Sequence, residues 1–165
     1  EYILNYPNTE VRASFLTHLL MEFSNSQDND EIMISRLVNT LENKDLDEFF
    51  ERIKEVFSNI PAIIFMANKE AYYHTIIYLI LTLIGVRIAA EVHTNKGRID
   101  AVVETNERIY VFEFKMANSK QAIKQIETKK YYEKYLTSKK EILLVGVSFD
   151  IEERNIKEWI VKHEQ

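Results

Sequence analysis

Apolar residues recur every three or four positions through the first 60 residues, which is the spacing of one face of a helix. The pattern predicts three amphipathic helices, at residues 8–23, 30–41 and 46–57. The clearest of them is the third, whose apolar side consists of Leu46, Phe49, Phe50, Ile53 and Phe57. None of the three contains a set of side chains typical of catalysis. We therefore expect them to form a packing layer.

From residue 61 the pattern changes, and runs of apolar residues with the length of strands alternate with helical segments. The predicted helices lie at 70–84, 120–136 and 152–163, and the predicted strands at 86–93, 98–104, 108–115 and 141–149. This order, α-β-β-β-α-β-α, predicts an α/β fold with a mixed sheet flanked by helices on both faces. The last strand is reached through a helix and should lie parallel to its neighbour.

Composition narrows the class of protein. A chain of 165 residues with 46% apolar residues is long enough to bury a hydrophobic core. It contains no cysteine, which excludes disulfide bonds and thiolate metal sites. The most apolar stretch, residues 76–84, is far shorter than the roughly 20 residues required to cross a bilayer. We expect a soluble, cytoplasmic protein. Because the chain begins at Glu1 rather than Met, we also expect it to be part of a longer protein.

The charge is unevenly distributed along the chain. The net charge is −5, and residues 1–60 are strongly acidic. Residues 115–140, in contrast, hold eight lysines against two glutamates, Glu127 and Glu133. Such a run is either a solvated helix face or a local phosphate-binding surface, since binding depends on the local potential more than on the total charge.

The segment 97–115 contains the candidate catalytic side chains. With residues 106 and 107 as a two-residue hairpin turn, Ala101 pairs with Phe112. One step further, Asp100 lies opposite Glu113. Two carboxylates that face each other across a ladder are destabilising unless something compensates their charge. The sequence therefore predicts a compensated pair at this position.

Two kinds of compensation are open. One carboxyl could be protonated, or a hard divalent cation could lie between the two, completed by a backbone carbonyl and waters. Lys115 projects from the same strand face as Glu113 and could neutralise part of the charge or stabilise charge that develops on a phosphate. On an exposed strand, however, Glu113 and Lys115 would form only a weak ion pair.

The motif Gly97-Arg98-Ile99-Asp100 followed by Glu113-Phe114-Lys115 resembles the signature of the PD-(D/E)XK nuclease superfamily. In particular it resembles the bacterial subgroup in which such a domain follows an AAA-ATPase-like module. The similarity extends over nearly the whole chain, from residues 5–12 to residues 146–149, and the segment 125–131 matches the helix after the catalytic strand.

The resemblance implies a restriction-endonuclease-like core. It also implies that Asp100, Glu113 and the backbone carbonyl of Phe114 hold Mg²⁺ or Mn²⁺, and that Lys115 assists the attacking water. Ile99 stands where the eponymous proline would be, a change shared by many members with a G-x-x-D form.

Two further acidic residues are candidates for completing the metal site. Members of the superfamily often supply an acidic group from the helix before the first strand, which points to Glu70. Glu91, in the first predicted strand, is a second candidate. The alternatives are that Glu70 is a helix N-terminal residue favoured by the helix dipole and that Glu91 pairs with Arg87 or Arg98.

Nucleic-acid contacts are expected from the predicted helix 120–136, because Gln125, Lys129 and Tyr132 share one of its faces. The alternative is an amphipathic face exposed only to solvent. The complete set of candidate nucleic-acid-binding residues is Gln125, Lys129, Tyr132, Lys120, Lys124 and Arg98.

The sequence thus predicts a Mg²⁺-dependent nuclease domain at residues 61–165, acting on nucleic acid and on DNA rather than RNA. Residues 1–60 are expected to form a helical segment that leads from an upstream ATPase-like domain, the second expected partner. Two alternatives remain open. The domain could be a catalytically inactive nuclease fold used for binding, or its acidic N-terminal helices could dock on a protein partner.

Overall fold

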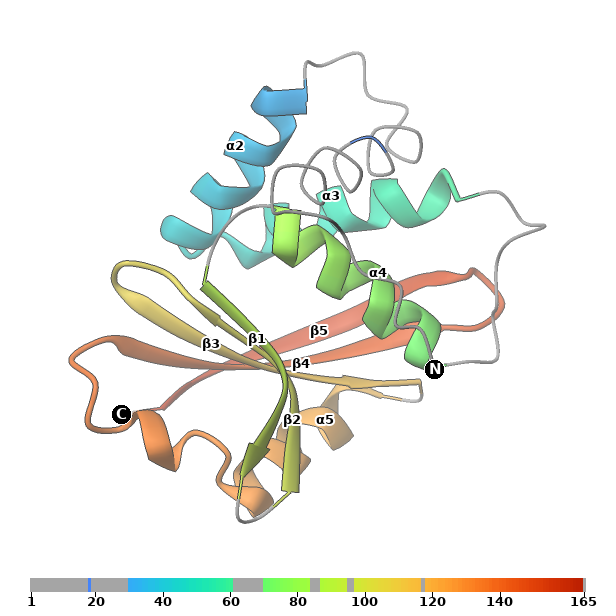
Figure 1. Cartoon of the computed structure of the whole chain (residues 1–165). Helices are drawn as coiled ribbons and strands as arrows, with labels where there is room; N and C mark the ends of the chain where they lie inside the picture. The colour runs from blue at the N-terminus through green and yellow to red at the C-terminus, as the bar shows by residue number, and fades with distance from the viewer. Residues whose placement is uncertain are drawn as a thin grey trace, which may run out of the picture.

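The protein is seen in a computed structural model that describes residue 18 and residues 30–60, 70–83, 87–94, 97–116 and 118–164. Its centre is a five-stranded sheet with the strand order β1-β2-β3-β4-β5. Helices α2, α3 and α4 pack on one face of this sheet, and α5 packs on the other (Figure 1). The predicted mixed sheet flanked by helices is confirmed.

The strands follow one another across the sheet in chain order. They are β1 (Arg87–Thr94), β2 (Gly97–Glu104), β3 (Arg108–Lys115), β4 (Glu141–Asp150) and β5 (Asn155–Glu164). All neighbouring pairs are antiparallel except β3 and β4, which are parallel. A parallel pair requires a crossover, and α5 (Ser119–Lys129) provides it, as the sequence predicts.

The remaining helices are α2 (Asp30–Glu42), α3 (Leu46–Ser58) and α4 (Glu70–Leu83), close to their predicted ranges. The predicted helix at 8–23 lies outside the described residues, except for His18, which is helical. Asp45 caps α3 by accepting a hydrogen bond from the backbone N–H of Glu48 at 3.0 Å. This bond satisfies one of the N–H groups that a helix leaves open at its start.

Two hydrophobic cores form because side chains alternate between the faces of the strands. The larger core joins α2, α3 and α4 to the sheet and includes Phe50, Tyr73 and Phe112. The smaller core joins α5 to the other face and includes Val111 and Ile126. Each sheet face is therefore covered by helices, and the central strands β3 and β4 are buried on both sides.

The predicted final helix at 152–163 is wrong, because residues 155–164 form strand β5. Ile156, Trp159 and Ile160 have helical spacing, which explains the error. In the structure Trp159 and Val161 pack against the larger core, whereas Ile160 packs against the smaller one. An edge strand between α3 and α5 needs apolar residues on both faces, and this requirement blurs the alternation expected of a strand.

The predicted helix at 120–136 is too long. Helix α5 ends at Lys129, because Lys130 adopts the left-handed conformation, with φ 51° and ψ 46°. This conformation usually requires glycine or asparagine, so the sequence gives no sign of the end. A turn and a short 3₁₀ helix, η2 (Glu133–Tyr135), follow before β4.

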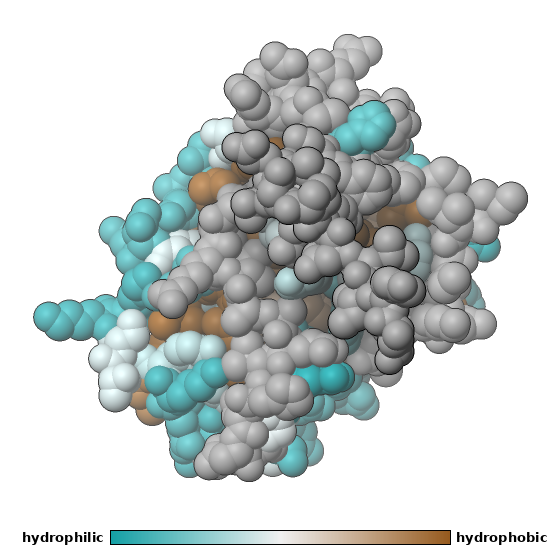
Figure 2. Space-filling model, in the orientation of Figure 1, coloured by the Kyte–Doolittle hydropathy of each residue, from teal (hydrophilic) through white to brown (hydrophobic). Residues whose placement is uncertain are grey.

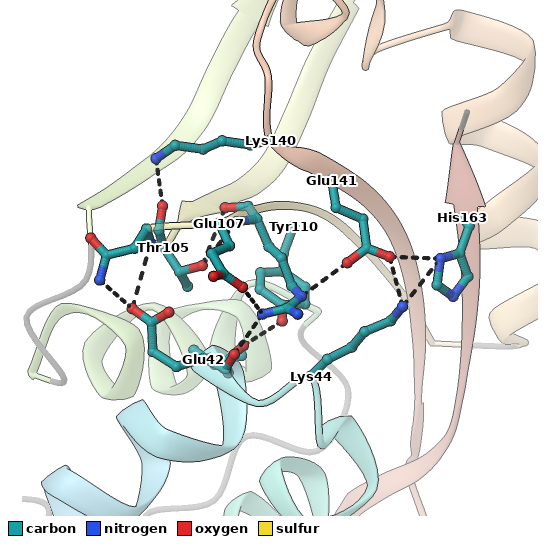
Figure 3. Close-up of polar contacts among 11 residues, drawn as sticks. Glu42, Lys44, Thr105, Glu107, Tyr110, Lys140, Glu141 and His163 are labelled. Carbon is teal, nitrogen blue, oxygen red and sulfur yellow. Dashed lines mark hydrogen bonds and ion pairs between the residues drawn. The ribbon is translucent and has the colours of Figure 1, made fainter.

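A polar cluster joins the turn after α2 to the end of the sheet (Figure 3). The Glu141 carboxylate accepts hydrogen bonds from Lys44 at 2.6 Å and from Arg108 at 2.9 Å, and it lies 2.9 Å from Nδ1 of His163. The buried Tyr110 hydroxyl donates to the Leu41 carbonyl at 2.5 Å. The Tyr110 bond satisfies a backbone carbonyl in the last turn of α2. Together these contacts fix the helical layer on the sheet.

Candidate active site

The β2–β3 hairpin places the candidate residues, and its register is the one that the sequence predicts. Ala101 pairs with Phe112 and Val103 with Tyr110. At the turn, the backbone N–H of Thr105 donates to the carbonyl of Arg108 at 2.9 Å. Any shift of one residue would move each side chain to the opposite face. The confirmed register is therefore what brings Asp100 beside the Glu113-Phe114-Lys115 motif.

The β2–β3 ladder ends at the Ala101–Phe112 pair. The next hydrogen-bonded pair would join Phe114 to Ile99. Instead, the backbone N–H of Phe114 donates to Oδ2 of Asp100 at 2.9 Å. A side-chain carboxylate thus takes the place of a backbone acceptor. Beyond this point β1 and β2 turn away from the other three strands (Figure 1).

Glu113 is buried on the α5 side of the sheet, with 1% of its surface exposed. Its Oε1 accepts a hydrogen bond from Nζ of Lys115 at 2.9 Å and another from Nε2 of Gln125. The second oxygen, Oε2, is also buried. A buried carboxylate is costly unless charged or polar groups compensate it. Lys115 supplies the charge and Gln125 supplies a neutral donor from the neighbouring helix.

Gly146 explains how Gln125 reaches Glu113. It lies on β4 directly beside Glu113 in the parallel register. A Cβ atom at this position would lie 2.6 Å from the Ser119 carbonyl oxygen and 2.9 Å from the backbone nitrogen of Ile123. Only glycine allows α5 to come this close to the sheet. Gly146 was not among the predicted site residues, although a glycine inside an otherwise apolar strand signals a close backbone approach.

Glu158 on β5 fixes the start of α5. Its Oε1 accepts hydrogen bonds from the Ser119 hydroxyl at 2.7 Å and from the Ser119 backbone N–H at 3.2 Å. These two bonds lower the pKa of Glu158 below its ordinary value of 4.5. Asn118 caps the same helix through the backbone N–H of Gln121. The segment that supplies Gln125 is therefore held at its first turn, a role that sequence patterns did not reveal.

The side chains of Glu70 and Glu91 lie outside the described residues, so their predicted part in a metal site stays a prediction. Their backbones place them at the first position of α4 and within β1. Within the ranges that the structure describes, no three His, Cys, Asp or Glu side chains gather as a metal site. Asp100 and Glu113 are the two predicted carboxylate ligands whose side chains the structure describes.

The donor chemistry of this pair fits a small divalent cation. Asp100 and Glu113 supply carboxylate oxygens, and the residue after Glu113, Phe114, supplies a backbone carbonyl. Mg²⁺ prefers oxygen ligands and keeps several waters, so one or two protein carboxylates suffice. The Asp100 bond to Phe114 uses one oxygen, Oδ2, and a carboxylate has a second oxygen that can also bind a cation.

The predicted nucleic-acid-binding residues fall into two groups. Gln125 contacts Glu113 directly, and Tyr132 is half buried against the smaller core. The others are exposed, on the outer side of α5 and at the start of β2, and they are Lys120, Lys124, Lys129 and Arg98. The structure thus brings one predicted contact residue into the candidate active site and leaves four charged ones accessible around it.

Among the described helices, none is both long enough and apolar enough to cross a membrane.

Comparisons with known proteins indicate the family of the chain. The family model described as "PD-(D/E)XK nuclease superfamily" matches residues 68–159, more than half of the chain. A protein of Azotobacter chroococcum mcd 1, named "Uncharacterized protein in vnfD 5'region", is 30% identical over 168 residues, which cover 98% of this chain and 33% of that protein. The chain thus spans about a third of the length of this curated relative. No solved structure matches the chain.

The matched residues 68–159 run from just before α4 into β5 and contain both halves of the motif, Asp100 and Glu113-Phe114-Lys115. The mixed sheet flanked by helices is consistent with the restriction-endonuclease-like fold that the resemblance implies. The chain therefore belongs to the PD-(D/E)XK nuclease superfamily.

Proposed function

We propose that this chain is a Mg²⁺-dependent nuclease that hydrolyses phosphodiester bonds in nucleic acid, with DNA as the expected substrate. The observation behind the proposal is the arrangement of three residues at the end of the β2–β3 ladder. Asp100 bonds to the backbone of Phe114, and Lys115 bonds to the buried carboxylate of Glu113. Two adjacent carboxylates and a lysine are suited to phosphodiester hydrolysis.

In this proposal Asp100, Glu113 and the carbonyl of Phe114 hold the metal, with Glu70 or Glu91 as further candidate ligands. A bound Mg²⁺ or Mn²⁺ would polarise the scissile phosphate and lower the pKa of a bound water. The buried position of Glu113 supports this role, because a carboxylate in a water-poor environment interacts more strongly with a cation.

Lys115 is proposed to orient the attacking water and to stabilise the negative charge that develops on the phosphate. Its side chain is 25% exposed, whereas Glu113 is almost fully buried, so the ammonium lies at the border between the site and solvent. Gln125 holds Oε1 of Glu113 from the other side. It acts in this scheme as a positioning residue for the carboxylate as well as a candidate contact to nucleic acid.

Nucleic acid is proposed to bind along the outer side of α5 and the start of β2, through the exposed Lys120, Lys124, Lys129 and Arg98, with Tyr132 and Gln125 beside them. Lysine side chains bind phosphates as point charges and do not distinguish one base from another. Such a surface supports binding that is independent of sequence.

The larger context is proposed from the sequence resemblance and the length of the curated relative, of which the chain covers 33%. We propose that residues 61–165 form the nuclease domain and that residues 1–60 lead from an upstream ATPase-like domain of a longer, cytoplasmic protein. In the structure α2 and α3 share the larger core with the sheet, so these two helices also support the fold.

Cleavage of a substrate panel tests the function. Labelled single-stranded and duplex DNA and RNA, linear and circular, are incubated with the protein and Mg²⁺, Mn²⁺ or EDTA. We expect metal-dependent cleavage that disappears in Asp100→Ala and Lys115→Ala and persists in Lys54→Ala, a control on α3. If the protein is no more active than the two site variants, the proposed nuclease function is wrong.

A further inference from the structure

A concentration of positive charge begins at the last residue of α5, Lys129, and continues through the segment 129–140 that leads to β4. We call this segment the lysine loop. It contains Lys129, Lys130, Lys134, Lys139 and Lys140 and one acidic residue, Glu133. Lys130 pairs with Glu133 at 3.5 Å, and Lys140 pairs with Glu104 at 2.9 Å.

Three lysines of the loop, Lys129, Lys134 and Lys139, are exposed and form no ion pair within the part of the chain that the structure describes. Lys134 instead lies 4.8 Å from the centre of the Tyr135 ring. The loop therefore presents several positive charges that the described carboxylates do not neutralise.

The lysine loop is folded tightly onto the protein. Its Tyr131 is buried, and Tyr132 and Tyr135 pack against the smaller core. Backbone hydrogen bonds from Tyr135 to Tyr132 at 2.8 Å and from Ser138 to Tyr135 at 2.9 Å close successive turns. The backbone that bears the lysines is thus already ordered, which lowers the entropy that a partner must remove on binding.

Tyr131 connects the lysine loop to the candidate active site. A Cβ atom at Gly97 would lie 2.8 Å from the Tyr131 hydroxyl, so the loop packs directly on the start of β2. Figure 1 shows the orange segment after α5 beside the end of the β1–β2 hairpin. The exposed Arg98 follows Gly97, and Asp100 is two residues further, roughly 7 Å along the strand.

The chemistry of this surface favours phosphate groups. Lysines bind the nucleic-acid backbone, whereas docking of a protein usually requires a larger apolar patch. In the described residues of the loop, the only strongly exposed large apolar side chain is Leu136. In Figure 2 the corresponding area, at the lower left, holds hydrophilic and intermediate residues with brown patches between them.

We infer that the lysine loop binds the phosphate backbone of the same nucleic acid whose phosphodiester bond lies at Asp100 and Glu113. This inference rests on the proposed function, because it takes the substrate from it. The proposed binding surface then runs past α5, from Arg98 to Lys139. Binding to the added part is expected to depend neither on nucleotide sequence nor on metal.

Equilibrium binding in EDTA tests the inference apart from catalysis. Binding of fluorescein-labelled 30-nucleotide single-stranded and 30-base-pair duplex DNA is followed by anisotropy at several salt concentrations. The test variant is Lys134→Gln with Lys139→Gln, two side chains that form no described ion pair. The matched control, Lys54→Gln with Lys157→Gln, removes the same charge from α3 and β5.

We expect weaker binding for the Lys134/Lys139 variant and a flatter dependence of log K on log salt. The loss of two phosphate contacts reduces the slope by about 1.4 for single strands and about 1.8 for duplex DNA. The control should keep the wild-type slope. The inference is overturned if the test variant keeps that slope, if the control loses as much, or if the wild type binds neither DNA.

The binding test and the cleavage test can fail independently of each other. Cleavage without an effect of Lys134 and Lys139 on binding would refute the inference alone. Binding that depends on the two lysines, without metal-dependent cleavage of any substrate, would refute the nuclease function alone.

Discussion

The carboxylate of Asp100 accepts a hydrogen bond from the backbone N–H of Phe114, 2.9 Å from Oδ2, at the point where the β2–β3 ladder ends. The same side chain thus closes a hairpin and provides a candidate metal ligand. Its neighbour Glu113 is held by a lysine and a glutamine. Asp100 therefore has a structural role and a proposed role in catalysis, and different substitutions at this position can separate the two roles.

Asparagine and alanine at position 100 are predicted to differ in stability. Asp100→Asn keeps an oxygen that accepts the Phe114 N–H, so the free energy of unfolding should stay within about 1 kcal/mol of wild type. Asp100→Ala leaves that buried N–H without its acceptor, at a cost of about 1–3 kcal/mol. Urea denaturation measures both. Equal stability of the two variants would mean that the hydrogen bond contributes little.

Gly146→Ala is predicted to destabilise the protein and to displace α5. The new Cβ would lie 2.6 Å from the Ser119 carbonyl oxygen and 2.8 Å from the Ile123 side chain, and overpacking of this kind costs about 1–3 kcal/mol. The control is Ser148→Ala, two residues along β4.

Ser148 is fully buried, and its hydroxyl has no hydrogen-bond partner among the residues that the structure describes. Ser148→Ala should therefore be neutral or slightly stabilising. It removes a buried hydroxyl whose desolvation is not offset by a hydrogen bond to any described residue. Urea denaturation of Gly146→Ala and Ser148→Ala gives the comparison. If Gly146→Ala unfolds at the wild-type urea concentration, the close approach of α5 to the sheet does not require glycine at position 146.

Gln125→Ala is predicted to weaken catalysis without unfolding the protein. Gln125 is partly exposed on α5, and its loss leaves Lys115 as the remaining described hydrogen-bond donor to Oε1 of Glu113. Loss of a residue that orients a metal ligand typically reduces metal affinity or activity by about 10- to 100-fold. The control is Gln121→Ala, an exposed residue one turn earlier. Equal cleavage rates for the two variants would show that Gln125 does not contribute to catalysis.

Acid is predicted to weaken the polar cluster around Glu141. The hydrogen bond from Lys44, followed by the one from Arg108, lowers the pKa of Glu141 below its ordinary value of 4.5. A carboxyl with a lowered pKa in the folded state stabilises the protein above its ordinary pKa, and this stabilisation disappears as the pH falls through the folded-state value. Glu141→Gln should therefore flatten the decline of melting temperature between about pH 5 and pH 3.

The control for Glu141→Gln is Glu51→Gln, an exposed residue of α3 with the same change in charge. Glu158, whose pKa is also lowered, should still contribute an acid-dependent loss in both variants. A Glu141→Gln protein whose melting temperature declines with acid as steeply as the control would show that the cluster does not stabilise the fold.

Much of the site could be predicted from sequence because it depends on local rules. A two-residue turn fixes the pairing of every residue in the hairpin, so the positions of Asp100 and Glu113 follow from counting. The contribution of α5 could not be predicted in this way. It depends on Gly146 and Glu158, which lie 33 and 45 positions after Glu113 and act through packing.

The errors arose where tertiary structure overrides a local pattern. Residues 155–164 have apolar spacing that suits a helix, yet they complete the sheet between two helical layers. Lys130 ends α5 in a left-handed conformation that its side chain does not favour. Burial of the next residue, Tyr131, against Gly97 supplies a physical reason for this turn.

We propose above that Asp100 and Glu113 form one divalent-cation site. Isothermal titration calorimetry with Mn²⁺ tests it most directly, on the wild type, Asp100→Asn, Glu113→Gln and the exposed control Glu107→Gln. We expect Mn²⁺ binding by the wild type and the control, and loss of that binding in both site variants. Binding that survives in both site variants, or a wild type that binds no Mn²⁺, would contradict it.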